Sequence, residues 1–441
     1  MPADDHFGPL RRSIETRSAR ISVVGLGYVG LPLLAAVADA GFPAIGVDRD
    51  ASKITDLRAG RTYLPHLPDS IIRSITSATD LTLADDRAAL AGADIILLCV
   101  PTPLDEQRRP DLSAVEAASD EIARHAVGAD SGRPRLVVLE SSTFPGTTRG
   151  VVAPRVLAPA PGAPIAFAYS PEREDPGNAR FTTRTIPKLV GGLDEAGTAL
   201  AVSVYERIVE TVVPCRTAEV AEAAKLVENV YRSINIALVN ELKIVLDALG
   251  LDVWEVLDAA ATKPFGFHRF NPGPGLGGHC VPIDPFYLSW LAREAGVESR
   301  FIELAGEINH AMPGYVVQKT EAALGERGVP LDGARVLVLG VAYKKNVADI
   351  RESPAFPIIE QVRARGAAVD YHDPHVPRTH KGRRRDYEMT SIDWSLDAVA
   401  SYDAVIVVTD HDWYDWDGVA SHARVLVDSR AVVAPSRATR A

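Results

Sequence analysis

Cysteine is scarce in this sequence. Its 441 residues include three cysteines, Cys99, Cys215 and Cys280, too few and too scattered for a disulfide framework or a zinc site. No apolar run is long enough to cross a membrane, and the charged segment from Met1 to Arg20 lacks the apolar core of a secretory signal peptide. These absences favour a reducing, cytoplasmic setting with free thiols, and we expect residues 1–19 to form a disordered tail.

Positive charge is also in deficit. The chain has 47 Lys and Arg against 58 Asp and Glu, which gives a net charge of −11. This balance argues against binding to nucleic acid or to an anionic membrane, although local Lys and Arg can still hold a phosphorylated small molecule. The length predicts two or three domains with ample core.

The first ordered segment has the pattern of a dinucleotide-binding fold. An apolar run at 21–24 leads directly into GLGYVG, from Gly25 to Gly30, and then into a helical run that reaches Ala40. A second apolar run ends at Asp48, 23 residues after Gly25, close to the spacing of about 20 expected for an acid that bonds the ribose. The acid favours NAD over NADP, whereas Arg49 beside it could hold a 2′-phosphate. The residues assigned to the cofactor here are Gly25, Gly27, Tyr28, Val29, Gly30, Asp48 and Arg49.

The parallel-strand pattern continues with buried strands predicted over 94–100, 135–139 and 165–168. Ligands of open α/β sheets lie beyond the carboxyl ends of the strands. Residues at these ends are Pro101, Thr102, Thr143, Glu172 and Arg173. Helix caps and turns are the alternative explanation. It is stronger for Thr102 than for Glu172, since the segment SPEREDPG concentrates charge there.

A single long helix is predicted from Thr217 to about Leu249, because the segment is rich in Ala, Leu and Glu and has no Pro or interior Gly. Lys225 and Asn229 are four residues apart and share one face of it. They are either a snorkelling lysine and a core amide, or a pair that faces the reactive cavity. The helix is longer than one small domain, so we expect it to span domains or to form a dimer interface.

The stretch from Asn271 to Pro285 combines four glycines with several prolines and Cys280. Such a composition predicts a shaped loop. Asp284 and Pro285 then suit the N-cap and first residue of a helix. The helix dipole would favour a thiolate at Cys280, which makes it a candidate nucleophile; a buried structural cysteine is the alternative.

A second α/β pattern follows a linker at 328–333, with strands predicted at 334–339, 369–372, 404–408 and 425–427. After the first of these strands Lys344 and Arg351 suit a phosphate or carboxylate ligand. The predicted fold class is therefore α/β, with two Rossmann-like, doubly wound parallel-sheet domains joined by a helical region with one long central helix. The expected boundaries are 20–212, 213–327 and 328–441.

Five segments in order resemble the UDP-glucose/GDP-mannose dehydrogenase family. They are GLGYVG with Asp48, SPEREDPGN at 170–178, AEAAKLVENVYR at 221–232, NPGPGLGGHCVPIDP at 271–285 and YKKNVADIRESP at 343–354. The resemblance implies an NAD domain, a central helical domain that forms a homodimer, and a UDP-binding domain. Within the family, the second segment is similar to that of UDP-N-acetylglucosamine 6-dehydrogenases. UDP-glucose dehydrogenases carry a second acid four residues after the one matching Glu172, where this chain has Pro176.

The chemistry implied by this resemblance is a four-electron oxidation of a sugar C6 alcohol through a Cys280 thiohemiacetal and thioester. Lys225 with Asn229 would stabilise oxyanions, and Asp284 would assist proton transfer or position Lys225. Thr143 and Glu172 would hold or activate water. The resemblance adds Pro101, Thr102, Thr143 and Arg351 to the NAD site, although Arg351 could also anchor the substrate with Lys344. The substrate-binding residues it implies are Glu172, Arg173, Lys225, Asn229, Asn271, Gly275, Gly277 and Lys344.

Several alternatives stay open. UDP-N-acetylglucosamine is the expected substrate, with UDP-N-acetylmannosamine and UDP-glucose as competing sugars. A two-electron dehydrogenase in which Cys280 is structural, and a non-catalytic nucleotide-sugar sensor, are the competing functions. No metal is expected.

Overall fold

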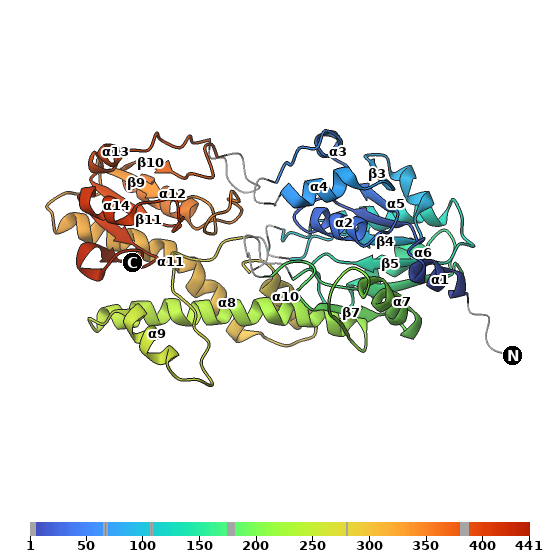
Figure 1. The fold of residues 1–441 in the computed structure, drawn as a ribbon. Coiled ribbons are helices and arrows are strands. Elements are labelled where there is room, and N and C mark those ends of the chain that lie inside the picture. Colours follow the sequence, from blue (N-terminus) through green and yellow to red (C-terminus); the bar gives the residue numbers. More distant parts are fainter. Residues whose placement is uncertain are drawn as a thin grey trace. The chain divides into compact units, whose positions relative to one another are not determined.

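The computed structural model describes residues 6–64, 67, 69–105, 107, 109–173, 181–278, 281–379 and 388–441. The chain forms two compact units, Met1–Glu228 and Asn229–Ala441, and Figure 1 shows the elements of both along the chain.

The first unit is built on a sheet of eight strands within the described residues, in the order β3-β2-β1-β4-β5-β6-β7-β8. Its strands are β1 Ile21–Val24, β2 Ala44–Val47, β3 Leu81–Ala84, β4 Ile95–Leu98, β5 Arg135–Leu139, β6 Ile165–Tyr169, β7 Lys188–Gly192 and β8 Val212–Pro214. Its α-helices are α1 Gly8–Glu15, α2 Gly30–Asp39, α3 Ala51–Arg58, α4 Asp69–Ser77, α5 Ser113–Ile122, α6 Ala153–Leu157 and α7 Glu195–Tyr205. Its shorter helical turns are η1 Arg87–Gly92, η2 Ala123–Val127 and η3 Thr148–Val152. Strand order reverses at β1, which pairs in parallel with β2 on one side and β4 on the other. This reversal is where α/β sheets bind nucleotides.

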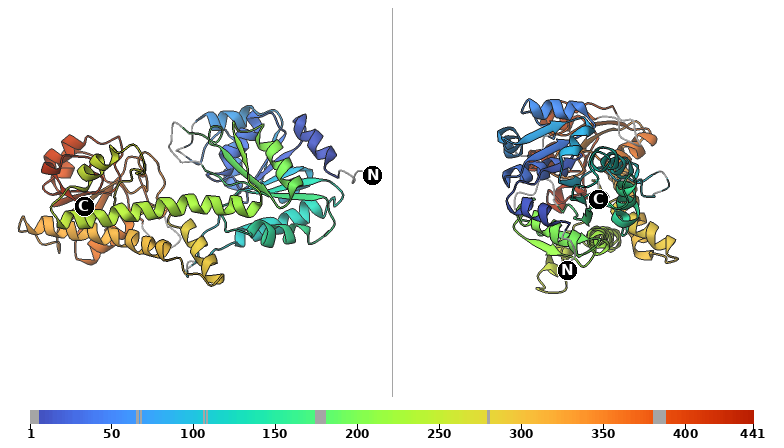
Figure 2. Two further views of the ribbon diagram at one scale, coloured as in Figure 1. Left: turned by 90° about the horizontal axis from the view of Figure 1, so that it is seen from below. Right: turned by 90° about the vertical axis from the view of Figure 1, so that its right-hand side faces the viewer.

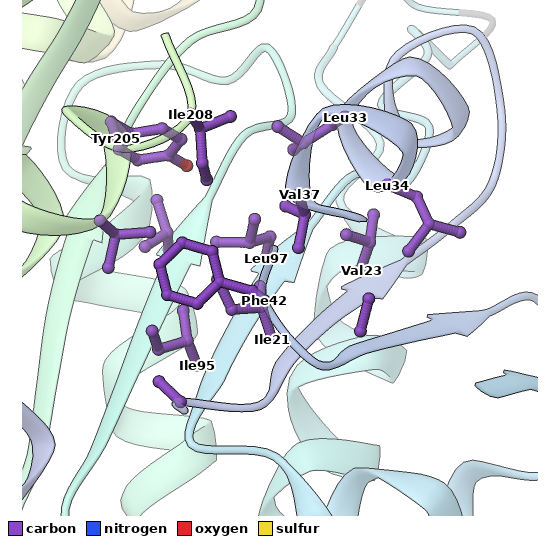
Figure 3. Close-up of a cluster of buried hydrophobic side chains, with 14 of the residues drawn as sticks. Ile21, Val23, Leu33, Leu34, Val37, Phe42, Ile95, Leu97, Tyr205 and Ile208 are labelled. Atoms are coloured by element: carbon purple, nitrogen blue, oxygen red, sulfur yellow. The ribbon is translucent and has the colours of Figure 1, made fainter. Parts of the chain in front are cut away.

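Helices cover both faces of this sheet, which explains why its central strands are apolar along their whole length. The core on one face joins β1 and β4 to α1, α2, α3, α4 and α7, and the core on the other joins β4 and β5 to α5 and α6. Figure 3 shows the first of these cores, with Leu33 and Val37 of α2 above Ile21 and Leu97 of the strands. The glycine loop after β1 is thereby held between two packed layers.

One strand pairing differs from the predicted parallel sheet. Strand β7 runs antiparallel to β6, with Tyr169 opposite Gly191 and Ala168 opposite Gly192. The segment at 188–192 has the apolar character of a buried strand but carries no mark of direction. The antiparallel course places the start of β7, rather than its end, at the carboxyl end of β6.

The expectation of a disordered tail is wrong for the part that the structure describes. Residues Gly8–Glu15 form helix α1, whose Leu10 and Ile14 are buried in the core and which packs against α7. The two apolar side chains are four residues apart and so share one face of a helix. Their burial outweighs the charge of the neighbouring arginines, which stay exposed.

The long central helix is confirmed as α8, Ala218–Ala248, of 31 residues. At 1.5 Å per residue it is about 46 Å long. Figure 2 shows it as one unbroken helix. The two compact units divide inside it, between Glu228 and Asn229, so the boundaries expected at 212 and 327 stay predictions.

The second unit contains a sheet of five strands within the described residues, in the order β10-β9-β11-β12-β13 and parallel throughout. Its strands are β9 Arg335–Leu339, β10 Ala368–His372, β11 Ala404–Val407, β12 Leu426–Asp428 and β13 Thr439–Arg440. Its α-helices after α8 are α9 Val253–Ala261, α10 Asp284–Glu294, α11 Arg300–Gly325, α12 Ala355–Ala364, α13 Leu396–Ala400 and α14 Trp416–His422, with the short turn η4 at Pro435–Arg437. Helices α11 and α12 pack on one face, and α13 and α14 on the other. The predicted class of two Rossmann-like sheets with one long helix is confirmed.

Candidate active site

The glycine loop after β1 has room for a dinucleotide only on one side. A Cβ added to Gly30 would lie 1.9 Å from the Gly25 carbonyl oxygen, and one added to Gly25, at a φ of +93°, would lie 2.6 Å from the Cys99 carbonyl oxygen. A Cβ on Gly27 would meet no atom within 4 Å. Gly25 and Gly30 therefore let the loop, β4 and α2 close on each other, and Gly27 leaves open space beside the start of α2. This cradle fits a pyrophosphate bound at a helix N-terminus.

Asp48 follows β2 and braces this loop. Its Oδ2 accepts from the Leu26 N–H at 2.8 Å and from Lys53 Nζ at 3.0 Å, and its Oδ1 accepts from the Asp50 N–H at 2.9 Å. A carboxylate has about four acceptor positions, so roughly one remains for a ribose hydroxyl. Arg49, the residue that could favour NADP, is exposed next to it. The carboxylate at this position fits NAD, because it would repel a 2′-phosphate.

Thr102 and Thr143 follow the neighbouring strands β4 and β5, and both are buried. The Thr102 hydroxyl donates to the Ser142 carbonyl oxygen at 2.7 Å. The Thr143 hydroxyl has no hydrogen-bond partner among the side chains and backbone that the structure describes. Buried hydroxyls nearly always have a partner, so Thr143 fits a role in holding a ligand or water. Pro101, the third residue predicted here, is exposed at the end of β4.

Glu172 belongs to a buried ionic cluster. Lys188 Nζ lies 2.6 Å from Glu140 Oε2 and 3.3 Å from Glu172 Oε2, and Tyr205 donates its hydroxyl to the other oxygen of Glu140. Burial raises the pKa of Glu140, with Lys188 opposing the shift. Burial also disfavours charge on Lys188, but attraction to Glu140 and Glu172 outweighs it and raises the pKa of that lysine. The lysine therefore stays protonated.

The loop after β6 is held to α8 by Arg173. Its guanidinium contacts Glu228 Oε1 at 2.6 Å and donates to the Pro187 carbonyl oxygen at 2.7 Å. Lys225, one turn earlier on α8, is buried with 8% of its surface exposed. Arg173 thus has protein partners in this structure, and its contact with substrate stays a prediction.

Glu222 ties α8 to the loop after Thr143. Its carboxylate is fully buried and accepts from the N–H of Gly146 at 2.6 Å and from both the N–H and the hydroxyl of Thr148, at 2.9 and 2.7 Å. Glu222 lies three residues before Lys225, and Gly146 three residues after Thr143. The contact therefore joins the two segments of the first unit that carry these predicted site residues.

In the second unit Asn229 and Asp284 form a direct pair. The Asn229 Nδ2 donates to Asp284 Oδ2 at 2.6 Å, and 6% and 1% of the two residues is exposed. The prediction that Asp284 is the N-cap of its helix is wrong. Helix α10 begins at Asp284 with Ile283 at the cap position and no side-chain capping bond. The carboxylate accepts from the Asn229 amide on α8 instead, and its predicted role in proton transfer or in positioning Lys225 stays a prediction.

A pocket of the second unit collects four of the eight residues predicted to bind substrate. Its lining consists of Ile236, Asn271, Gly273, Gly275, Leu276, Gly277, Val281, Tyr343, Lys344 and Arg430. Glycine is required at Gly277, because a Cβ there would lie 2.7 Å from the Cβ of Tyr343. The loop therefore packs its backbone directly on the segment after β9. Arg430 is held by a bond from its Nε to the Val408 carbonyl oxygen at 2.7 Å.

Arg351 forms a two-pronged pair with Asp349, with Nη2 to Oδ2 at 2.6 Å and Nε to Oδ1 at 3.0 Å. Its backbone carbonyl accepts from the Gly278 N–H at 3.0 Å. The structure therefore connects Arg351 to the glycine-rich loop through its backbone.

Cys280, the predicted nucleophile, lies outside the described residues, as does the segment 174–180 with Pro176. Sequence reasoning missed Lys188, Glu140, Glu222 and Arg430. Glu140 and Arg430 each follow a buried strand within two residues of its carboxyl end, which is a signal that could have singled them out. Lys188 opens an otherwise apolar strand, and an ammonium there needs a carboxylate nearby.

Within the described parts of the chain, no group of three or more His, Cys, Asp or Glu side chains could hold a metal ion. No helix described there has the length and apolar character needed to cross a membrane.

Sequence comparisons identify three domains in order. The NAD binding domain of the UDP-glucose/GDP-mannose dehydrogenase family matches residues 19–209, its central domain 219–311 and its UDP binding domain 337–435. The matched NAD domain contains the glycine cradle and Asp48, and the matched UDP domain contains Lys344 and Arg430. The comparison therefore agrees with the predicted cofactor and with a UDP-sugar substrate.

Relatives and solved structures align over nearly the whole chain. The UDP-N-acetyl-D-glucosamine 6-dehydrogenase of Pseudomonas aeruginosa is 32% identical over 90% of this chain and 91% of its own length. The UDP-N-acetyl-D-mannosamine dehydrogenase of Methanococcus maripaludis is 31% identical over 89% of this chain and 86% of its own length. The structure of a UDP-glucose dehydrogenase from Pyrobaculum islandicum superimposes with a TM-score of 0.86 at 30% identity, covering 96% of both chains. Because three domain matches occur in the family's order and these relatives align over most of their own lengths, this chain belongs to the UDP-glucose/GDP-mannose dehydrogenase family and is an NAD-dependent nucleotide-sugar dehydrogenase.

Proposed function

We propose that this enzyme oxidises the C6 alcohol of a UDP-N-acetylhexosamine to the uronate, with UDP-N-acetylglucosamine as the preferred sugar. The observation that carries the proposal is that two relatives named for UDP-N-acetyl sugars align at 31 and 32% identity over about nine-tenths of this chain. The sequence at Pro176 supports it further, since UDP-glucose dehydrogenases are expected to carry an acid there. The similar score of a mannosamine relative makes UDP-N-acetylmannosamine the main competing substrate.

The overall reaction converts one CH₂OH group, one water and two NAD⁺ into a carboxylate, two NADH and three protons. NAD⁺ bound at the glycine cradle supplies the acceptor for each of the two hydrides that leave C6. Glycine-loop N–H groups and the Asp48 carboxylate would hold it, with Thr102 at the neighbouring strand end. The residues described below supply the remaining steps.

In the first half the C6 alcohol releases its proton to solvent as its hydride leaves, which gives an aldehyde. The Cys280 thiolate then forms a C–S bond to C6, and the carbonyl electron pair moves to oxygen. Lys225 would stabilise this oxyanion, with Asn229 one helical turn away on the same face. Asp284 accepts a hydrogen bond from the Asn229 amide at 2.6 Å, and this bond fixes the orientation of the amide.

In the second half the thiohemiacetal loses a second hydride and becomes a thioester. Water attacks the acyl carbon, its proton moves to the Glu172 carboxylate, the C–S bond breaks, and the electron pair returns to Cys280 as a thiolate. The Thr143 hydroxyl, buried without a protein partner in the described structure, is suited to orient that water. Glu172 then releases the proton to solvent.

The pocket of the second unit would hold the nucleotide end of the substrate. Lys344 and Arg430 provide cations for the diphosphate, and Asn271, Gly275 and Gly277 provide backbone and amide contacts from the glycine-rich loop. Arg430 is the addition that the structure makes to the residues predicted from sequence. Arg351, whose guanidinium is paired with Asp349, is assigned to the cofactor side in this proposal.

We also propose a homodimer through α8. Four large side chains of the second unit, Tyr231, Leu238, Val245 and Leu249, are between 48 and 68% exposed. The first three are seven residues apart along α8, which places them on one stripe of the helix, and Leu249 directly follows the helix end. Monomeric proteins rarely leave such a stripe in water, and a second copy of this chain would cover it. Light scattering after gel filtration should give twice the mass of 47.3 kDa, and a monomer at micromolar concentration would refute the proposal.

The function is tested with a panel of UDP-sugars assayed for NADH and for product. The expected result is two NADH per uronate, with the highest kcat/KM for UDP-N-acetylglucosamine. One NADH per substrate, with an aldehyde product, would establish the two-electron alternative. Tight binding without turnover of any UDP- or GDP-hexose would establish a sensor. A higher kcat/KM for UDP-glucose would refute the interpretation of Pro176.

A further inference from the structure

The antiparallel strand β7 brings a lysine to Glu172. Tyr169 of β6 lies opposite Gly191 of β7. Continuing this register three residues outward places Glu172 opposite Lys188, the first residue of β7. A parallel strand would have put its last residue there instead. The direction of one strand thus delivers an ammonium group to the carboxylate that is proposed to activate water.

This ammonium group is fixed from several sides. Lys188 Nζ contacts Glu140 Oε2 at 2.6 Å and Glu172 Oε2 at 3.3 Å, and it lies 5.4 Å from the centre of the Tyr205 ring. Tyr205 in turn donates its hydroxyl to the second oxygen of Glu140. Exposure of the side chains is 0% for Glu140, 4% for Lys188 and 12% for Glu172. Glu172 is thus the most exposed of these three charged groups and faces the solvent side of the cluster.

Among the described residues, ionisable groups near Glu172 come from several elements of the first unit. Lys188 of β7 attracts the ionised form, and Glu140 after β5 opposes it from behind the lysine. Cys99 after β4 adds no charge, because burial raises its thiol pKa well above the ordinary value. Arg173, next in sequence to Glu172, directs its guanidinium to Glu228 on α8 at 2.6 Å. Lys188 is therefore a cation in direct contact with the Glu172 carboxylate.

We propose that Lys188 is a positioning residue for Glu172, whose carboxylate it holds ionised and in a fixed orientation so that it can accept the proton of the hydrolytic water. Glu140 and Tyr205 hold the lysine in turn. The inference rests on the role given to Glu172 in the proposed function. It adds the reason why a carboxylate whose side chain is only 12% exposed can serve as a base, since burial alone would favour its protonated form.

The sign of the expected pH effect follows directly. A base must be deprotonated, so activity falls as pH drops through its pKa, and a neighbouring cation lowers that pKa. Replacing Lys188 by methionine should move the acid limb of kcat to higher pH by about one unit and lower kcat more than it changes KM. Replacement of Glu140 by glutamine should move the acid limb to lower pH. It removes the anion that competes for Lys188, so the ammonium group then interacts with the Glu172 carboxylate alone.

The experiment measures kcat across the acid range with both UDP-N-acetylglucosamine and NAD⁺ saturating, because the hydrolytic step follows both hydride transfers. The variants are K188M, K188R, E140Q, the double variant E140Q/K188M, and E172Q. K188R keeps the cation and should keep the limb near its original pH. The double variant removes the lysine together with its buried counter-charge, so it folds without an unpaired buried ion, and its limb should stay at the higher pH.

The outcomes separate this inference from the proposed function. A fast E172Q variant with an unchanged acid limb would refute the role of Glu172 and the inference with it. A slow E172Q variant, combined with an unshifted limb in K188M and in the double variant, would overturn the inference alone and leave Lys188 as a structural counter-charge to Glu140. A shift of the acid limb in the same direction for E140Q and K188M would also overturn the inference. Removing an anion and removing a cation must shift the pKa of Glu172 in opposite directions, whereas a disturbed fold can shift both limbs the same way.

Discussion

Replacing Glu222 by glutamine should destabilise the first unit, because the fully buried carboxylate accepts three hydrogen bonds that one amide cannot. Its Oε2 accepts from the Gly146 N–H, and its Oε1 accepts from the N–H and the hydroxyl of Thr148. A glutamine can turn its oxygen to one side or the other. Either orientation leaves one backbone N–H, of Gly146 or of Thr148, facing an NH₂ group in the protein interior.

The magnitude follows from the hydrogen bonds that the substitution breaks. A hydrogen bond to a charged group contributes about 1.5–3 kcal/mol, and leaving a buried donor unsatisfied costs about 1–3 kcal/mol. The two free energies overlap, because losing the bond is what leaves the donor unsatisfied, so they are not simply added. We therefore expect E222Q to lower the free energy of unfolding by about 2–4 kcal/mol. At about 2–4 °C per kcal/mol for a unit of this size, the midpoint should fall by roughly 5–15 °C.

Glu219, one turn earlier on α8, offers a matched control. It pairs with Arg149 at 2.7 Å, but 30% of its side chain and 54% of that of Arg149 are exposed. An exposed pair contributes about 0–1 kcal/mol, so E219Q should leave the midpoint almost unchanged. The assay is thermal unfolding of both variants by calorimetry and circular dichroism in one buffer. Equal midpoints for E222Q and E219Q would refute the reasoning.

Three further predictions concern the reaction. C280A should abolish uronate formation and leave UDP-sugar affinity, measured by calorimetry, nearly unchanged; normal uronate production would return Cys280 to a structural role. Because the Asp48 carboxylate repels a 2′-phosphate, kcat/KM for NAD⁺ should exceed that for NADP⁺ by more than about tenfold, or about 1.4 kcal/mol, and equal values would show that Arg49 decides the choice. K225A should lower kcat far more than it raises KM, because oxyanions exist mainly along the reaction path, and a pure KM effect would assign Lys225 to substrate binding.

The features predicted from the sequence are those set by neighbours along the chain. The glycine loop and Asp48 follow from local spacing, since tight turns and helix starts depend on adjacent residues. The long helix needed only an uninterrupted run of helix formers. Both appear in the structure at the expected positions, within a residue or two at the helix ends.

The features that were missed depend on partners far away in sequence. Lys188 contacts Glu140, 48 residues earlier, and the five-residue sequence of β7 does not reveal the strand direction that brings the two together. Asp284 has a good capping sequence, yet it accepts a hydrogen bond from Asn229, 55 residues earlier. Helix α1 could not be predicted from the sequence, because its arginines make the segment look solvent-exposed. Leu10 and Ile14 are the two large apolar side chains in it that indicate burial.

The continuity of α8 limits how this chain can be divided for study. The two compact units separate between Glu228 and Asn229, which are neighbours in the middle of a helix and not in a linker. A fragment ending there would expose four backbone carbonyls without donor partners and would lose the turns that support Lys225. A cut just before Ala218 or just after Ala248 keeps the helix intact, but either cut leaves all of α8 in one fragment and none of it in the other. Separate production of the two halves therefore requires that the helix be duplicated in both.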